Sequence, residues 1–401
     1  MKPNIQCRIC GSKIKKFLDL GEQPLANSFP KSKDEIEAKY PLEVFWCEDC
    51  NLVQLGNVVD REEVFRDYIY FSSGMPKLSN HFKTYAEDVI NRFLKKGGSV
   101  VELACNDGIL LKHFKDKGYK VLGIDPAKNI RLVSEKLEID VIVDFFSEDL
   151  AKSLPQTDVI IANNVVAHID DHHDLARGIF KLLKDDGVFV LEAPYLMDMF
   201  ENLTYDTIYH EHLSYLAVRP LKRLFEQYGL EIFEVQVNEI QGYSLRIFIG
   251  HKGKHEITPS VQRYINQELT MGLNKFETYE ELAQRIIAQK VKLMNLLLDL
   301  KDGGKRIAAY GAPAKGNTVL NYCGIDNTIL DYALEDLSNK QGLYTPGTYI
   351  PIVSSEYAHA NEPDYYLMLA WNYRNAILEK EQEFRNRGGR FIIPVEGIKI
   401  I

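Results

Sequence analysis

Two C-x-x-C motifs, Cys7-Arg-Ile-Cys10 and Cys47-Glu-Asp-Cys50, constrain the fold of this chain more than any other feature. Each motif presents two sulfurs to one ion, so the pair supplies the four thiolates of tetrahedral zinc at about 2.3 Å. Four protein ligands leave no open position for water, which favours a structural over a catalytic zinc. The sequence therefore predicts a small zinc-binding module, whose core would be Phe17, Leu18, Leu20, Leu25, Phe29 and residues 40–46.

The chain has 401 residues, more than one hydrophobic core normally supports, so we expect two or three domains. Its 57 acidic and 48 basic residues give a net charge of -9, which disfavours a general nucleic-acid or anionic-membrane binder. The cysteine-containing segment also lacks a concentrated basic stripe. No run reaches the roughly 18 apolar residues of a membrane span, and the first residues lack the apolar core of a signal peptide. We therefore expect a cytoplasmic protein.

Residues 99–125 have the pattern of a nucleotide-binding βαβ unit. The apolar segment 99–103 predicts a strand, followed by a tight turn, a helix and a second strand. That second strand ends at Asp125, an acid placed to accept hydrogen bonds from ribose hydroxyls. The turn retains only Gly108 of the G-x-G-x-x-G pattern, and Glu102 would repel phosphate but suit the cationic end of S-adenosylmethionine (SAM). The methyl donor therefore fits better than NAD.

Further candidates for the ligand edge follow later strands of the same domain. Residues 158–164 predict a buried strand that delivers Asn163 and Asn164 to this edge. Asp144 and Phe145 follow the third strand and are candidates for the adenine pocket, although Phe145 fits a place in the core equally well. His168 is expected at the start of the next helix.

An aromatic, glycine-terminated loop and a helix precede this domain. In the loop, residues 67–74, Tyr70 is the better polar candidate for a ligand contact, while Tyr68 and Phe71 fit packing between domains equally well. From residue 77 to residue 96 the apolar positions fall at helical spacing, which predicts an amphipathic entry helix.

The segment from Thr207 to Tyr215 holds two imidazoles, a carboxylate and two phenols within nine residues. This density of groups that bind and release protons indicates acid–base chemistry. The structural alternative is a polar loop whose side chains cap backbone groups.

A second α/β unit is predicted near the C-terminus. Between residues 258 and 300 the apolar positions have helical spacing, as expected for long connecting helices. Residues 303–318 then repeat the order of strand, glycine turn and helix. The backbone amides of that turn, with Lys315, suit the phosphates of an activated sugar. The alternative is a duplicated scaffold that only covers the catalytic face.

The cysteine motifs occur together with Glu102 and Asn106-Asp107-Gly108, and with segments 123–127, 162–168, 209–215 and 310–317. In this combination nearly the whole chain resembles the SAM-dependent sugar C-methyltransferases that act on nucleotide-linked 4-keto deoxysugars. The resemblance implies an α/β protein with a class I methyltransferase Rossmann-like central domain. We expect a zinc-binding module over 1–66, the methyltransferase domain over 67–257, a helical linker over 258–300 and a Rossmann-like substrate domain over 301–401.

The resemblance also implies roles for individual residues. In this reaction class, removal of the hydrogen on C3, next to the C4 ketone, gives an enolate. His212, or less favourably His210, would be the base, with Tyr209, Glu211, His168 and Tyr70 around the sugar. The expected SAM-binding residues are Glu102, Ala104, Asn106, Asp107, Gly108, Asp125, Pro126, Asp144, Phe145, Asn163 and Asn164. The expected substrate-binding residues are Tyr195, Tyr215, Tyr310, Lys315 and Asn317.

Two residues depart from the family pattern. Ala104 stands where the first glycine of the cofactor turn is usual, and Tyr243 stands where a second glycine is common. If position 104 needs a positive φ, its Cβ would strain the loop and weaken cofactor binding.

Two other functions remain open at this point: a sugar O-methyltransferase, which needs no enolisation, and a zinc-ribbon scaffold with a degenerate transferase site. The identity of the sugar and of its nucleotide, the configuration at C3 and the oligomeric state are open as well.

Overall fold

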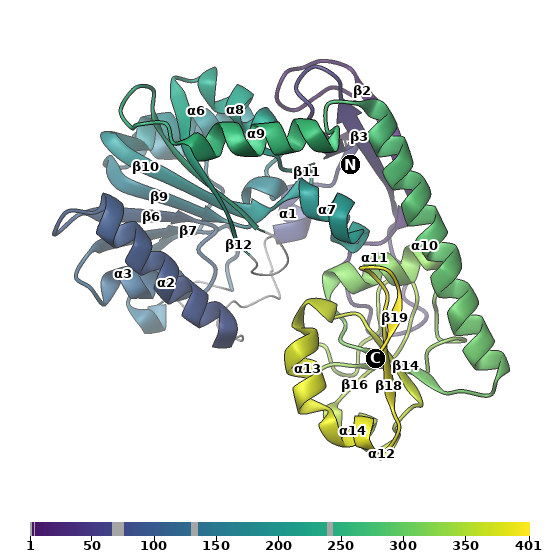
Figure 1. Ribbon diagram of the computed structural model, residues 1–401. Helices are drawn as coiled ribbons and strands as arrows, with labels where there is room; N and C mark the ends of the chain where they lie inside the picture. Colours follow the sequence, from purple (N-terminus) through teal and green to yellow (C-terminus); the bar gives the residue numbers. More distant parts are fainter. Residues whose placement is uncertain (1, 4, 66–75, 130–134, 239–243) are drawn as a thin grey trace.

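The computed structural model describes residues 2–3, 5–65, 76–129, 135–238 and 244–401 (Figure 1). Within these residues the strands form sheets of two, four, seven and six strands. Figure 1 shows the seven-stranded sheet on one side of the molecule and the six-stranded sheet on the other, with the N-terminal strands behind the long helix that joins them.

The N-terminal module is built on the four-stranded sheet, in the order β11-β4-β3-β2. Leu42, Val44 and Trp46 alternate toward its core along one strand, with the period of two that a half-buried strand requires. A short pair, β1 and β5, lies beside the sheet. The elements of the module are β1 (Lys2–Pro3), β2 (Ile14–Gln23), β3 (Tyr40–Cys47), β4 (Val53–Leu55), β5 (Asn57–Val58) and α1 (Arg61–Phe65).

One strand of this sheet comes from elsewhere in the chain. Strand β11 (Ser214–Tyr215) pairs antiparallel with β4, with Ser214 opposite Gln54 and Tyr215 opposite Val53. The end of the histidine-rich segment is therefore an edge strand of the N-terminal module.

The central sheet has the strand order β12-β13-β10-β9-β6-β7-β8, with β13 antiparallel to both of its neighbours. The strand order reverses between β6 and β9, the switch point at which ligands bind in open α/β sheets. Its strands are β6 (Ser99–Leu103), β7 (Lys120–Ile124), β8 (Val141–Ile142), β9 (Thr157–Asn163), β10 (Leu183–Pro194), β12 (Leu230–Asn238) and β13 (Ser244–His251). This is the class I methyltransferase architecture that the sequence predicted.

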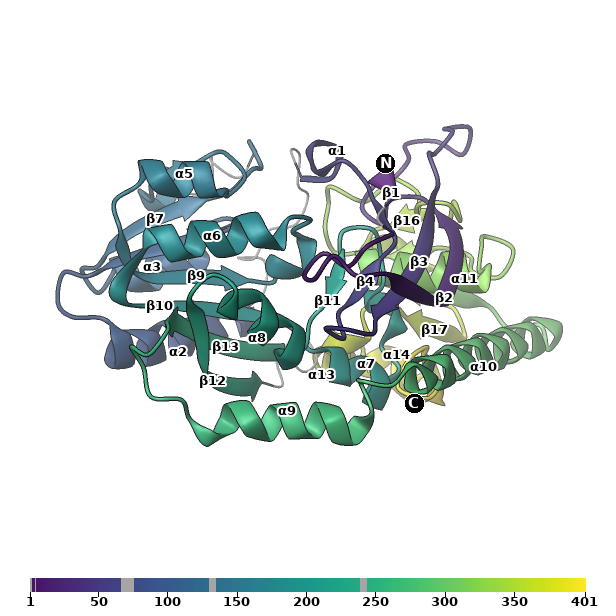
Figure 2. The same ribbon diagram turned by 90° about the horizontal axis from the view of Figure 1, so that it is seen from above.

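Helices cover both faces of the central sheet (Figure 2). Val159 and Ile161 of β9 belong to the core under α2 and α3, while Ile160 and Ala162 belong to the core under α6 and α8. A strand buried on both faces reads as a continuous apolar run, as the sequence showed. The helices are α2 (Pro76–Phe93), α3 (Ile109–Lys115), α5 (Glu148–Ser153), α6 (His172–Leu182) and α8 (Val218–Glu226).

Short elements lie at the edge of this domain, and one of them carries the candidate catalytic residue His168. They are the 3₁₀ turns η2 (Glu135–Leu137), η3 (Val166–His168) and η4 (Tyr205–Thr207) and the helix α7 (Leu196–Asn202). The expectation that His168 begins a helix was wrong: it ends η3. The next helix begins at His172, because the side chain of Asp171 caps its first amides.

Two helices, α9 (Pro259–Met271) and α10 (Phe276–Asp302), connect the central and C-terminal sheets. The apolar stripe predicted for the second helix is confirmed, since Leu282, Ile286, Leu293 and Leu297 are all buried. Figure 1 shows α10 running along the outer side of the molecule toward the C-terminal domain.

The C-terminal sheet has the order β16-β15-β14-β17-β18-β19, and its pairs are parallel except for β18 with β19. A second Rossmann-like unit is therefore present, as the sequence predicted. Its strands are β14 (Ile307–Tyr310), β15 (Ala333–Leu334), β16 (Ile352–Val353), β17 (Tyr365–Met368), β18 (Arg390–Ile393) and β19 (Lys399–Ile400). Its helices are α11 (Ala314–Cys323), α12 (Ser355–Ala360), η5 (Trp371–Tyr373), α13 (Arg374–Lys380) and α14 (Gln382–Asn386).

None of the helices that the structure describes is long and apolar enough to cross a bilayer.

Candidate active site

The predicted cofactor-binding residues lie along the carboxyl edge of the central sheet. Leu103 pairs with Ile124 and with Ala162, so the residues that follow them, Ala104, Asp125 and Asn163, lie at one edge. The register therefore brings together the three strand ends that the sequence assigned to one ligand.

Backbone strain is concentrated in the turn after β6. Ala104 has a φ of 52°, Asn106 a φ of 47° and Gly108 a φ of 76°. Asparagine and glycine tolerate the left-handed region, whereas alanine does so at a cost of about 1 kcal/mol. Position 104 thus has the positive φ at which an alanine strains the loop. Asp125 stabilises the turn, because its Oδ2 accepts the Asn106 N–H at 3.0 Å.

Acidic groups gather at this turn. Glu102 is buried, and its Oε2 has no hydrogen-bond partner among the described residues. Burial, followed by the nearby Asp107 and Asp125, raises the pKa of Glu102 well above its usual range. Asp125 is also buried, and its Oδ1 accepts the Ala127 N–H at 2.9 Å, across Pro126. A buried carboxylate oxygen that lacks a hydrogen-bond donor among the described residues fits the ammonium and ribose groups of SAM better than a pyrophosphate.

The outer cofactor candidates are placed as follows. Asp144 is exposed, and its Oδ1 accepts the Phe145 N–H at 2.8 Å. The Phe145 ring lies 4.2 Å from the guanidinium carbon of Arg61 in α1. The amide group of Asn163 has no partner within the described part of the chain, and Asn164 has a φ of 53°. The adenine contact of Phe145 stays a prediction.

Tyr209 and His212 form a hydrogen-bonded pair. The Tyr209 hydroxyl lies 2.9 Å from His212 Nε2, and Nδ1 of the same ring lies 2.7 Å from the Thr207 carbonyl oxygen. Because a carbonyl oxygen only accepts, Nδ1 carries the proton of the neutral ring and Nε2 carries the lone pair that accepts the phenol. Burial, with Lys315 adding to it against the Thr207 carbonyl, lowers the pKa of His212 to about 4.

His168 connects this pair to the cofactor edge. It lies four residues after Asn164 at the end of β9, and its ring centre is 4.9 Å from that of His212 in an edge-to-face contact. Burial, followed by the proximity of His212, lowers the pKa of His168 to about 3. Both imidazoles are therefore neutral at physiological pH.

The remaining polar residues of the segment face the N-terminal module. His210 Nε2 lies 3.1 Å from the carbonyl oxygen of Tyr40, and Asn27 Nδ2 donates to Glu211 Oε1 at 2.6 Å. His210 thus donates its ring N–H to the backbone, which leaves His212 as the better base candidate.

Lys315 of the C-terminal domain lies near enough to His212 for its positive charge to add to burial in lowering the pKa of that imidazole. Lys315, in the first turn of α11, has its Nζ 4.3 Å from the centre of the Trp371 ring. Trp371 Nε1 donates to Asp206 Oδ2 at 2.6 Å, while Oδ1 of this fully buried carboxylate has no partner within the described ranges. Burial lowers the pKa of Lys315, against the attraction of Asp206, Asp198 and Glu396.

Sequence reasoning missed Asp206 and Trp371. Asp206 immediately precedes the segment from Thr207 to Tyr215, so an acid next to a histidine cluster was the available signal. Nothing in the local sequence marks Trp371, because its contact with Asp206 spans 165 positions of the chain.

Three predicted substrate-binding residues donate hydrogen bonds within the protein, and the hydroxyl of a fourth, Tyr215, is buried with no partner among the described residues. The Tyr195 hydroxyl donates to Glu268 Oε1 at 3.0 Å, and the Tyr310 hydroxyl donates to Glu381 Oε1 at 2.8 Å. Asn317 Nδ2 donates to the Ala26 carbonyl oxygen at 2.7 Å, and Tyr215 is buried in β11. Of the predicted substrate-binding residues, the structure thus brings only Lys315 near His212. Tyr70 and Tyr243 lie outside the described residues.

The four motif cysteines form one cluster, with all four sulfur atoms within 4.8 Å of one another. Cys7 Sγ lies 3.3 Å from Cys50 Sγ, and Cys10 Sγ lies 3.4 Å from Cys47 Sγ. The hydrogen bond with Cys47, followed by burial and against the hydrogen bond with Cys50, raises the pKa of Cys7 to about 12. Four converging sulfurs with no fifth polar ligand in the cluster fit a closed, structural zinc site.

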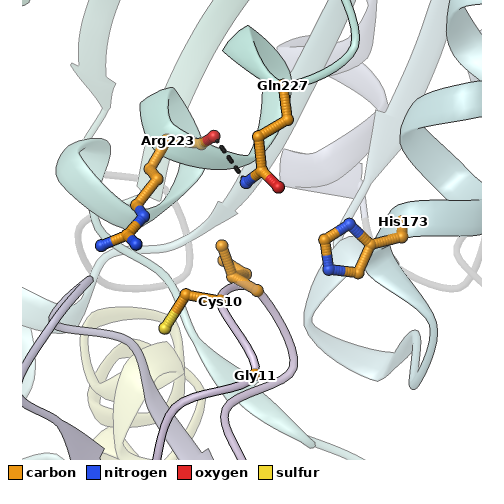
Figure 3. Close-up of a pocket in the computed structure, with 6 residues that line it drawn as sticks. Cys10, Gly11, His173, Arg223 and Gln227 are labelled. Atoms are coloured by element: carbon orange, nitrogen blue, oxygen red, sulfur yellow. Dashed lines mark hydrogen bonds between the residues drawn. The ribbon is translucent and has the colours of Figure 1, made fainter.

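A pocket of about 550 Å³ lies beside the first cysteine motif, between it and helices α6 and α8 (Figure 3). It is lined by Ile9, Cys10, Gly11, His173, Arg223 and Gln227. None of the candidate catalytic or SAM-binding residues that the structure describes lines it, so it is separate from the site described above.

Comparisons with known proteins agree with this architecture. One family model, described as a putative zinc binding domain, matches residues 7–65. A methyltransferase domain model matches 79–235, and a C-methyltransferase C-terminal domain model matches 239–396. The matches follow the order of the N-terminal, central and C-terminal sheets.

The chain is 34% identical to the C-methyltransferase NovU of Streptomyces niveus over 412 residues, which covers 100% of this chain and 98% of the relative. It is 28% identical to an uncharacterized methyltransferase of Alkaliphilus oremlandii over 38% of this chain and 71% of the relative. A solved SAM dependent methyltransferase from Archaeoglobus fulgidus is 20% identical, with a TM-score of 0.36, over 48% of this chain and 97% of that one.

The fold and the matched domains define a SAM-dependent methyltransferase with a zinc-binding N-terminal domain. More specifically, the chain belongs to the family of C-methyltransferases. The predictions of SAM over NAD and of an enzyme over a scaffold are confirmed at this level, and membership of the family favours methylation of carbon over methylation of oxygen.

Proposed function

We propose that this C-methyltransferase adds its methyl group to C3 of a nucleotide-linked 4-keto deoxysugar or a related keto sugar, through an enolate. The observation that carries the proposal is the contact between His168 and His212, whose ring centres are 4.9 Å apart. His168 follows the strand end at the cofactor edge, so this contact supports a position for His212 close to the expected methyl donor. Bound SAM supplies the electrophilic methyl group.

His212 is the base in this proposal. Its Nε2 has a lone pair, and its lowered pKa keeps that lone pair unprotonated at physiological pH. In the present structure Nε2 accepts the Tyr209 hydroxyl. When a ketone oxygen competes for the Tyr209 proton, Nε2 becomes free to take the C3 hydrogen. Tyr209 would then donate to the oxygen on which negative charge develops.

The cofactor-binding roles follow the same edge. Glu102 and Asp125 would hold the ammonium and ribose groups, with Asn106, Asp107 and Gly108 forming the turn beneath them. Ala104 shapes that turn, and Asn163, Asn164, Asp144 and Phe145 would complete the site. Charge supports this assignment, because a cluster of buried acids favours a cationic ligand.

Lys315 is the proposed contact of the C-terminal domain with the nucleotide sugar. It lies in the first turn of α11, where backbone amides and the helix dipole favour an anion. Its ammonium group lies over the Trp371 ring and is attracted by Asp206, Asp198 and Glu396, so an approaching diphosphate would compete with these acids for it. The proposed division of the chain into domains at 66, 257 and 300 gives this residue to the substrate domain.

The test is deuterium exchange at C3 without SAM. The probes are 4-keto deoxyhexoses linked to thymidine, guanosine and cytidine diphosphate, incubated in deuterium oxide and followed by NMR. The proposal expects the C3 proton of at least one probe to exchange, followed by a C3 methyl group when SAM is added. A methyl group on oxygen, with no exchange at C3, would contradict it.

A further inference from the structure

We propose that Arg8, between the first two zinc-binding cysteines, is a positioning residue that holds the histidine pair of the active site in register. The inference rests on the proposed function, because it takes His168 and His212 as catalytic groups. It adds a role for the zinc module in the reaction itself.

The Arg8 side chain forms hydrogen bonds with residues that closely follow His168 and His212 in the chain. Its Nη1 donates to the carbonyl oxygen of Leu213, the residue after His212, at 2.9 Å. Its Nε donates to Oδ1 of Asp170, two residues after His168, at 3.1 Å. One planar guanidinium therefore spans the two segments whose rings are 4.9 Å apart. Its donors are fixed relative to one another, so both segments are held at a set separation.

The same side chain is anchored in the zinc module. Nη1 also donates to the Leu55 carbonyl oxygen at 3.0 Å, and the Arg8 backbone N–H donates to Gln54 Oε1 at 2.9 Å. Leu55 N–H in turn donates to the Leu213 carbonyl oxygen at 3.0 Å. Arg8 is 7% exposed; its Nε and Nη1 donate to these partners, while Nη2 has none among the described residues. These contacts therefore fix Leu213 to strand β4 from two directions.

Further hydrogen bonds join residues 210–215 to the zinc module. His210 and Glu211 bond to Tyr40 and Asn27, and Ser214 and Tyr215 pair with β4. His212 is thus flanked on both sides by residues held by a module whose fold depends on its metal site. A displacement of about 1 Å at a reacting group is enough to reduce a rate 100-fold, so loss of this anchor should appear in kcat.

The experiment compares Arg8→Met, Arg8→Lys and the control Arg223→Met. Arg223 lies in α8 and donates from Nη1 to the Asp49 carbonyl oxygen at 2.9 Å, so it also bonds to the zinc module but does not contact residues 210–215. The measurements are kcat and KM, the Kd of SAM by calorimetry, zinc content by metal analysis, and amide hydrogen exchange of a peptide covering residues 210–216.

For Arg8→Met we expect kcat to fall by about 10- to 100-fold and exchange in 210–216 to become at least about 10-fold faster. The Kd of SAM should stay within about twofold and zinc content should not change. Arg8→Lys keeps the charge but loses the fork, so its kcat should lie between those of Arg8→Met and the wild type. Arg223→Met should match the wild type in kcat and in exchange.

Unchanged kcat and exchange in both Arg8 variants would overturn the proposal. So would an equal effect of Arg223→Met, since the role would then belong to the whole interface. If Arg8→Met does not fold, Arg8→Lys alone decides: wild-type exchange in 210–216 rejects the proposal. If His212→Asn remains active, the catalytic assignment falls, whereas faster exchange in Arg8→Met would still show that Arg8 holds the segment.

Discussion

The hydroxyl of Tyr209 lies 2.9 Å from Nε2 of His212, whose other ring nitrogen is held by the Thr207 carbonyl. This arrangement fixes the tautomer of the imidazole and directs its lone pair at the phenol. A proton acceptor and a proton donor are thus paired within four residues, beside the edge of the sheet where SAM is expected to bind.

Removal of the Tyr209 hydroxyl should remove the proton donor and leave the proton acceptor, His212, in place. In Tyr209→Phe, we expect kcat to fall by about 100-fold or more because the donor to the developing oxyanion is lost. SAM affinity, measured by calorimetry, should stay within about twofold. Tyr228→Phe is a matched control, because that phenol bonds to His173 outside the site. Full activity in Tyr209→Phe would remove Tyr209 from the mechanism.

The positive φ of Ala104 leads to opposite predictions for replacement by glycine and by valine. Ala104→Gly relieves the left-handed φ of 52° and should stabilise the protein by about 0.5 to 1 kcal/mol, with tighter SAM binding. Ala104→Val places a β-branched side chain at the same φ and should destabilise it by more than about 1 kcal/mol. Denaturant unfolding and SAM titration would measure both. A glycine variant that is less stable and binds SAM more weakly would refute the strain argument.

Lys315 should control the acid limb of the pH profile. The pKa of His212 is about 4, lowered first by burial and further by the positive charge of Lys315. Because the base must be unprotonated, kcat/KM should fall only as the pH drops toward 4. In Lys315→Met the pKa of His212 rises, so this limb should move to higher pH, and KM for the nucleotide sugar should increase at least about tenfold.

Lys290→Met is the control for this experiment. Lys290 also lies over an aromatic ring, that of Tyr322 at 4.4 Å, but on α10. Its replacement should leave the pH profile in place. An acid limb that does not move in Lys315→Met would show that the lysine does not act on His212.

Buried histidines should make the fold sensitive to acid. Burial, and then Arg8, lowers the pKa of His172 to about 3, so this residue is neutral in the folded state and charged in the unfolded state below about pH 6.5. The unfolded state therefore binds the extra proton, and stability falls as the pH drops from 6.5, by about 1.4 kcal/mol per pH unit for each such histidine. His172→Leu should flatten the dependence of unfolding free energy on pH between 6 and 4. An equal dependence of unfolding free energy on pH in the wild type and in His172→Leu would contradict this assignment.

The sequence was sufficient for features that depend on local patterns. The apolar run of β9 and the stripe of Leu282 to Leu297 each reflect which faces of an element are buried, and that information is local. The spacing of the cysteines likewise predicted the cluster of four sulfurs. The missing glycine pointed to position 104, and the structure supplies the positive φ on which the strain depends.

Other parts of the site depend on tertiary contacts that no local pattern encodes. Asp206 bonds to Trp371, and Arg8 bonds to Leu213, 205 positions away. The family resemblance implied that Tyr195 and Tyr310 contact substrate, yet both donate to buried glutamates. Strand ends are common positions for ligand contacts, but only the packed structure shows whether a hydroxyl already has a partner inside the protein.

The most direct test of the central claim is exchange of the C3 hydrogen in His212→Asn. The nucleotide-linked 4-keto deoxyhexose that the wild type accepts is incubated in deuterium oxide without SAM, and the C3 proton signal is followed by NMR. His173→Asn serves as the control, because this histidine bonds to Tyr228 away from the site. We predict that exchange and methylation are abolished in His212→Asn and kept in His173→Asn. Exchange in His212→Asn at the wild-type rate would contradict the account, because the proton would then be removed by a different residue.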